Sequence, residues 1–225
     1  MKKLLFALAL LIGTSAYAQE KDITKFLGIP IDGTKSEMIA KLKEKGFTPF
    51  GYNNDVLEGE FNGTDVGIFI ATNNNKVYRI MVCDRYPSEE RDIRIRFNNL
   101  CHQFENNPRY IKLSDEEYNI KEDEDIKYNI AVKPERYQAS YYQMVVDSLS
   151  IVNKVRNILL QKYTEEQLHN PTDEVNRGVN LVYYKAILDV VSKKHVWFMI
   201  SEVRGEYYIK MYYDNLLNEA NGEDL

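Results

Sequence analysis

The chain has 225 residues, of which 44% are hydrophobic and 28% are charged, and its formal net charge at pH 7 is −5. This length is enough for one large domain or two small ones, each with a core of its own. The acidic balance repels phosphate backbones, so nucleic acid is a poor partner, and no block of Lys and Arg suggests attraction to an anionic membrane surface.

The first eighteen residues have the order of a cleavable secretory signal. Two lysines follow the initial methionine, residues 4–12 are apolar, and residues 16–18 read Ala-Tyr-Ala. The apolar run is too short for a bilayer, which takes about 20 residues, and no later run approaches that length. We therefore expect cleavage between Ala18 and Gln19, export to the periplasm or the extracellular space, and no membrane span in the mature chain.

Residues 35–45 are predicted to form the first helix of the mature chain. Thr34 and Glu37 form a capping box, in which each side chain accepts a hydrogen bond from the other residue's backbone. Gly46 follows and supplies the left-handed conformation that commonly ends a helix.

An antiparallel meander and a second helix are expected next. Asn62-Gly63 is a strong hairpin signal, because both turn positions need positive φ. The expected strands of the meander are 56–61, 66–71 and 77–83. Apolar residues then recur at helical spacing between Pro87 and Pro108, which predicts a helix.

A polar, mostly acidic segment at 113–126 is interpreted as a link to a second half. The expected elements of that half are strands at 128–132 and 138–145, helices around 149–159 and 172–190, a hairpin of 195–201 with 206–213, and a short helix that stops at Gly222.

These elements predict an α+β protein built from two helix-plus-antiparallel-sheet units. After a signal peptide at 1–18, the first unit is expected at 19–113 and the second at 114–225. The last hairpin echoes the hairpin of 66–83, so the two units are candidates for a distant repeat.

Two stretches resemble a set of exported proteins of gut anaerobes. They are FLGIPIDGTKSEMIAKLKEKGF near the start and YYIKMYYDNLLNEANGEDL at the end. At the level of fold, the G-T-x-x-E helix at 33–37, followed by a meander, is similar to the units of β-lactamase inhibitor proteins and of small outer-membrane assembly lipoproteins. The resemblance implies export and this architecture, and it transfers no functional residue.

The cysteines, Cys83 and Cys101, both fall in the first expected unit. Export permits a disulfide between them, and a chain of this length does not require one. Free thiols are our expectation, with the disulfide as the alternative.

No catalytic motif supports an enzyme. The sequence contains neither a G-x-S-x-G elbow nor a glycine-rich phosphate loop, and its three histidines lack metal-site spacing. Glu166 and His169 supply only one copy of a motif that a di-metal bundle uses twice. We expect no catalytic residue, no metal site and no cofactor, although an enzyme built from dispersed residues would escape such a search.

The last hairpin carries the candidate binding site. Strand alternation places one aromatic set on a single face, apart from the apolar residues of the other face. The candidate binding residues are Trp197, Met199, Tyr208, Lys210 and Tyr212. Two explanations compete: a second packed layer covers this face, or the face is an exposed aromatic platform for a protein or a glycan.

The sequence therefore predicts an exported, non-enzymatic binding or scaffold protein whose partner is a protein or a glycan. The alternative is a hydrolase or other enzyme that acts on a cell-envelope or extracellular polymer. A cleft with converging carboxylates would favour the enzyme, and a flat aromatic face would favour binding.

Overall fold

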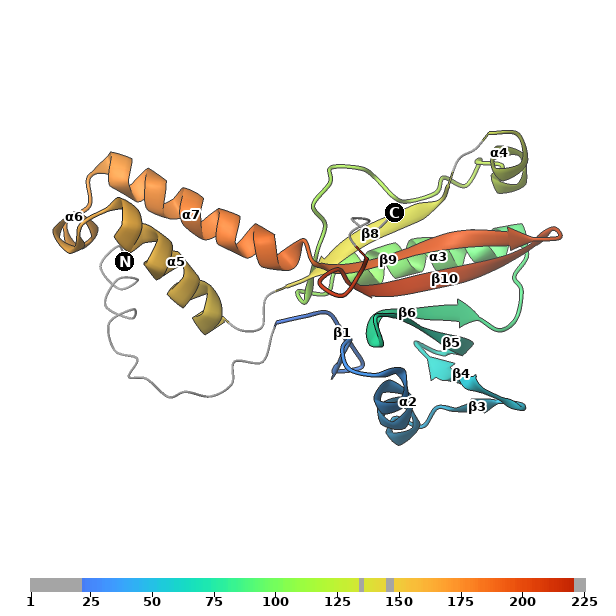
Figure 1. The fold of residues 1–225 in the computed structure, drawn as a ribbon. Helices are drawn as coiled ribbons and strands as arrows, with labels where there is room; N and C mark the ends of the chain where they lie inside the picture. Colours follow the sequence, from blue (N-terminus) through green and yellow to red (C-terminus); the bar gives the residue numbers. More distant parts are fainter. Residues whose placement is uncertain (1–21, 134–135, 145–147, 221–225) are drawn as a thin grey trace. The chain divides into compact units, whose positions relative to one another are not determined.

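The computed structural model describes residues 22–133, 136–144 and 148–220 (Figure 1). The expected signal peptide and Gly222 lie outside these residues. The short helix expected before Gly222 is wrong for the described residues, because β10 runs to Asn215 and residues 216–219 form turns and bends. The chain divides into a helical unit, to which residues 145–192 belong, and a sheet unit formed by residues 23–144 together with 193–225.

The sheet unit contains one large antiparallel sheet with the strand order β3-β4-β5-β6-β10-β9-β8-β7, and a two-stranded sheet of β1 and β2. The strands are β1 (Lys25–Phe26), β2 (Ile29–Pro30), β3 (Thr48–Phe50), β4 (Asn53–Phe61), β5 (Thr64–Asn73), β6 (Lys76–Asp84), β7 (Tyr110–Ile111), β8 (Gln138–Gln143), β9 (Lys194–Val203) and β10 (Glu206–Asn215). The predicted meander is β4-β5-β6, and the predicted last hairpin is β9-β10.

Tight turns with left-handed backbone connect the two strands of each of these hairpins. Two successive residues with positive φ match the right-handed twist of the strands on either side. The turn residues and their φ values are Asn62 (52°) and Gly63 (73°), Asn74 (47°) and Asn75 (61°), and Arg204 (57°) and Gly205 (84°).

The α+β class is confirmed, but the strands of both expected units join one sheet. β6 pairs with β10 over five residues, from Lys210 opposite Cys83 to Asp214 opposite Arg79. The expected boundary between residues 113 and 114 therefore does not separate two sheets. Pairing with β10 satisfies the backbone groups on the open edge of β6, which an isolated meander would leave exposed.

Two helices of the sheet unit, α2 (Lys35–Glu44) and α3 (Glu90–Glu105), pack on the same face of the large sheet, which we call the inner face. Figure 1 shows α3 behind β9 and β10. The capping box of Thr34 and Glu37 is present. Buried side chains on this face include Met38, Leu42, Ile68, Phe97, Val196, Phe198 and Met211.

Residues 126–132 form helix α4 (Ile126–Val132), so the strand predicted at 128–132 is wrong. The side chain of Asp125 accepts a hydrogen bond from the Tyr128 backbone N–H at 2.7 Å and caps the helix. Ile126 and Ile130, four residues apart, both pack on the core. Residues four apart share a face on a helix and also on a strand. The apolar pattern therefore could not distinguish the two structures, and the strand assignment was wrong.

The helical unit consists of α5 (Ser148–Lys162), α6 (Glu165–His169) and α7 (Asp173–Val191), and α5 and α7 match the two predicted helices. Thr172 caps α7 as expected. The unit has its own core of Ile151, Val155, Leu159, Leu168, Val175, Val182 and Ala186. Across the described residues, no helix is both long enough and apolar enough to cross a bilayer.

Candidate functional site

The opposite face of the large sheet, which we call the outer face, carries the predicted binding residues. Trp197 lies opposite Tyr212, and Met199 lies opposite Lys210. Tyr208 lies two residues before Lys210 and four before Tyr212 on β10, so all three side chains share one face. All five side chains are half-buried, while their neighbours in each strand are buried in the inner core.

A line of stacked rings crosses the outer face from β8 through β9 to β10. We call it the aromatic row, and it consists of Tyr142, His195, Trp197 and Tyr212. The ring centroids are 4.9 Å apart for Tyr142 and His195, 6.2 Å for His195 and Trp197, and 4.0 Å for Trp197 and Tyr212, with interplanar angles of 14° to 23°. The rings therefore present faces to one another along much of the row.

Asp214 anchors one end of the row. Arg79 donates from Nε to Asp214 Oδ1 at 2.6 Å and from Nη2 to Oδ2 at 2.8 Å, and Trp197 donates from Nε1 to Oδ2 at 2.9 Å. This fork holds the guanidinium 5.2 Å from the ring centroid of Tyr212 and 5.8 Å from that of Trp197. The Asp214 side chain is only 2% exposed, so the carboxylate is almost fully enclosed by its partners.

Ser140, His195 and Asp214 lie in the order of a hydrolase triad without its geometry. Ser140 Oγ is 2.6 Å from His195 Nε2, but His195 Nδ1 is 3.9 Å from Asp214 Oδ2, beyond hydrogen-bond reach. Asp214 instead serves Arg79 and Trp197. The arrangement therefore lacks the carboxylate contact that orients a catalytic imidazole.

Burial lowers the pKa of His195 below its ordinary value, the nearby Asp214 carboxylate raises it, and Arg79 lowers it. The imidazole is therefore neutral at pH 7. The charges of Arg79 and Asp214 neutralise each other in their ion pair. Among the five predicted residues, Lys210 is the one that carries a positive charge.

Both cysteines are free in the structure. Cys83 lies on the outer face opposite Lys210, and burial raises the pKa of its thiol. Cys101 is buried on α3, where burial raises the pKa of the thiol to about 12. Neither thiol has the lowered pKa of a reactive cysteine.

Sequence reasoning missed the residues that β6 and β8 add to the outer face. Arg79, Met81 and Cys83 come from β6, and Ser140 and Tyr142 come from β8. The alternation of buried and half-buried residues along β6 carried a signal, because Ile80 and Val82 are apolar. It could not reveal that β6 lies next to β10, since the two strands are more than 100 residues apart in sequence.

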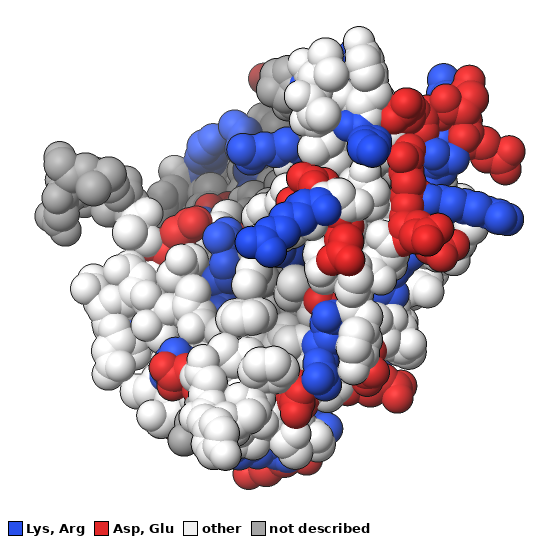
Figure 2. Space-filling model, turned by 90° about the vertical axis from the view of Figure 1, so that its right-hand side faces the viewer, with Lys and Arg blue, Asp and Glu red and all other residues white. Residues whose placement is uncertain are grey.

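Charges of both signs are mixed on the side of the molecule that carries the β9–β10 turn. Figure 2 shows acidic side chains at the upper right of this view, basic side chains through its middle, and a largely uncharged lower left. A nucleic-acid surface requires a continuous basic patch, which this side does not present.

Comparison of the chain with protein-family models, with curated proteins and with solved structures found no match. The suspected likeness to exported proteins of gut anaerobes stays a proposal. The candidate site is therefore argued from its geometry.

Proposed function

We propose that this chain is an exported, non-enzymatic protein that binds a protein partner through the outer face of its large sheet. The observation that carries the proposal is the position of the helices. α2 and α3 both pack on the inner face, and the outer face keeps half-exposed Trp, Tyr, Met and Arg side chains. These residue types are enriched in the centres of protein interfaces.

Ring orientation favours a protein over a glycan. Stacking against a sugar requires an aromatic face that is free for the ligand. Trp197 has Tyr212 against one side of its ring system, and Tyr212 is also approached by Arg79. The row thus offers ring edges, and the side chain of Met199 lies beside it, which suits irregular packing against a protein.

Binding is favoured over catalysis because the polar groups of the row are already bonded to one another. Asp214 is ion-paired, and Ser140 and His195 are not completed by a carboxylate at bonding distance. Such a network fixes side chains in place, and preorganised side chains reduce the entropic cost of binding.

Export is proposed on the order of charge, apolar run and Ala-Tyr-Ala in the first eighteen residues. It places the partner in the periplasm or outside the cell. N-terminal analysis of protein from an exporting host tests it: a mature chain that begins at Gln19 supports export, and a chain that still carries Lys2 and Lys3 contradicts it.

Site-specific photo-crosslinking in the exporting host tests the binding proposal. A photoreactive residue replaces Met199 on the outer face or, as the control, the fully exposed Tyr52 in the turn before β4. We expect a discrete protein adduct from position 199 that is absent from position 52. Adducts of the same protein from both positions, or none from position 199, would contradict the proposal.

The variant Met199→Glu then measures the contribution of the face. The new carboxylate lies opposite Lys210, so a cross-strand ion pair replaces the lost apolar contact and folding is preserved. We expect the affinity for the crosslinked protein to fall at least about tenfold, equal to about 1.4 kcal/mol. Tyr52→Glu should leave that affinity unchanged.

A further inference from the structure

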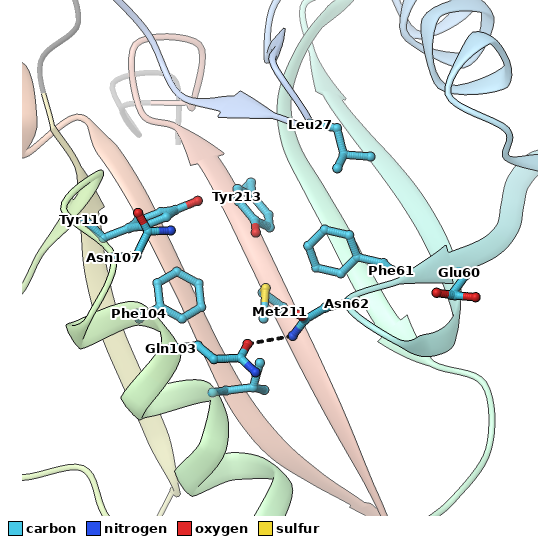
Figure 3. A pocket seen from close by; sticks show the side chains of 11 residues that line it. Leu27, Glu60, Phe61, Asn62, Gln103, Phe104, Asn107, Tyr110, Met211 and Tyr213 are labelled. Carbon is cyan, nitrogen blue, oxygen red and sulfur yellow. Dashed lines mark hydrogen bonds between the residues drawn. The ribbon is translucent and has the colours of Figure 1, made fainter.

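A separate cavity opens on the inner side of the sheet unit, between α3, the β4–β5 turn and the β1–β2 turn (Figure 3). Its volume is about 350 Å³, at the lower end of the range for small-molecule sites. Its apolar wall includes Phe61, Phe104, Met211 and Tyr213. These residues come from β4, α3 and β10, so rigid secondary structure forms the site.

Leu27 lines the cavity from the β1–β2 turn and has an unusual backbone conformation. Its φ is 51°, and that of the following Gly28 is 81°. Asn or Gly normally occupies the first of two such turn positions, because a larger side chain is strained there. Leu27 nevertheless keeps a large apolar side chain that is 39% exposed. Strained residues of this kind cluster at functional sites, so Leu27 is a candidate ligand contact.

The cavity presents no charged group to a ligand. Glu60 borders it, but its carboxylate lies on the face of β4 opposite Phe61 and points away from the cavity, as Figure 3 shows. Among the described residues, no Lys or Arg lines the cavity. Asn62 Nδ2 donates to Gln103 Oε1 at 2.8 Å and closes one side of the cavity, as Figure 3 shows. A charged ligand of either sign would therefore lose hydration in the cavity without meeting an opposite charge, whereas a neutral ligand would not.

We propose that this cavity binds a small, neutral, apolar ligand, with Leu27 as a direct contact. The proposal is independent of the outer face, because Phe61 and Phe104 pack in the inner core, on the other side of the sheet from Trp197. Failure of either proposal would therefore leave the other intact.

Titration with two fluorescent dyes tests the cavity. Nile red is neutral and apolar, and anilinonaphthalene sulfonate is apolar and anionic. We expect one saturable Nile red site and an affinity for the anionic dye that is at least about tenfold weaker, since no lining side chain offers the sulfonate an opposite charge. Glu60→Lys, on the opposite face of β4, should leave both affinities unchanged.

Leu27→Asn assigns the Nile red site to the cavity. Asn tolerates the left-handed backbone, so the turn and the melting temperature should be preserved while the apolar contact is lost. We expect binding to weaken by about tenfold, equal to about 1.4 kcal/mol. The matched control is Leu113→Asn, an exposed leucine that does not line the cavity.

Several results would overturn this assignment. Leu27→Asn could bind Nile red as tightly as the wild-type chain, or Leu113→Asn could weaken binding as much. The anionic dye could bind as tightly as Nile red. Loss of the Nile red site in Met199→Glu would place the dye on the outer face and contradict the cavity as its site.

Discussion

The indole of Trp197 lies nearly parallel to the phenol ring of Tyr212, with centroids 4.0 Å apart and planes 14° apart. The two residues are direct cross-strand partners in β9 and β10. Aromatic cross-strand pairs stabilise a sheet, and this pair also lies at the centre of the proposed binding face. Stability and the proposed binding would therefore depend on the same side chains.

Replacing Trp197 should lower the free energy of unfolding by less than replacing a fully buried aromatic residue would. Its ring is half-buried, so Trp197→Ala should lower the free energy of unfolding by about 2 kcal/mol, below the 3 to 5 kcal/mol of a fully buried aromatic residue. Trp197→Phe keeps a stacking ring and loses the hydrogen bond to Asp214, which should cost about 1.5 kcal/mol. Urea denaturation measures both. A loss near zero for Trp197→Ala would mean that the stack and the hydrogen bond do not form in solution.

Asp214→Asn should be the most destabilising single change on the outer face. It removes the charge that Arg79 contacts through two hydrogen bonds and leaves a guanidinium that is only 27% exposed without its counter-ion. We expect a loss of about 3 kcal/mol, at the lower end for a broken buried pair because Arg79 keeps some contact with water. The control Asp55→Asn breaks the more exposed ion pair with Lys35 and should cost less than about 1 kcal/mol. Equal losses in the two variants would contradict the anchoring role of Asp214.

His195 should make stability depend on pH. Burial is the main cause of its lowered pKa in the folded chain, so the unfolded chain binds the proton more readily. This contribution is complete above the unfolded value of about 6.5 and is lost as the pH falls through the folded value. His195→Gln should flatten this part of the profile. Denaturation at several pH values between about 5 and 8 measures it, and an unchanged profile in His195→Gln would contradict the assignment.

The two thiols should differ in reactivity. Cys83 is half-buried on the outer face and Cys101 is buried, with its pKa raised to about 12. A thiol reagent should therefore modify Cys83 slowly in the native protein and Cys101 only after unfolding. Binding of the crosslinked protein should slow modification of Cys83, which lies opposite Lys210. Equal rates with and without that protein would indicate that it binds elsewhere, and a lack of free thiol in the unfolded, unreduced monomer would indicate a disulfide.

Local signals in the sequence predicted most elements of the fold. The capping box of Thr34 and Glu37 marked α2, the Asn62-Gly63 turn marked the β4–β5 hairpin, and alternation gave the two faces of β9 and β10. Each of these signals acts within a few residues. The same reasoning failed at α4, where seven residues provide too little periodicity to separate a helix from a strand.

Long-range pairing could not be predicted from one sequence. The contact of β6 with β10 joins Arg79 to Asp214, and that of β8 with β9 brings Ser140 to His195. The local sequence of a hydrophobic strand does not indicate which other strand will pair with each of its edges. As a result, five residues of the site were predicted on β9 and β10, and the ion pair that anchors the aromatic row was missed.

Trp197 is the only tryptophan in the chain, so its fluorescence reports directly on the outer face. The decisive measurement is acrylamide quenching of this emission as the crosslinked protein is added. If the outer face binds that protein, quenching should fall in a saturable manner with the independently measured affinity, and Met199→Glu should shift the titration to higher concentration. Unchanged quenching at saturation would show that the protein binds away from Trp197 and would contradict the central claim.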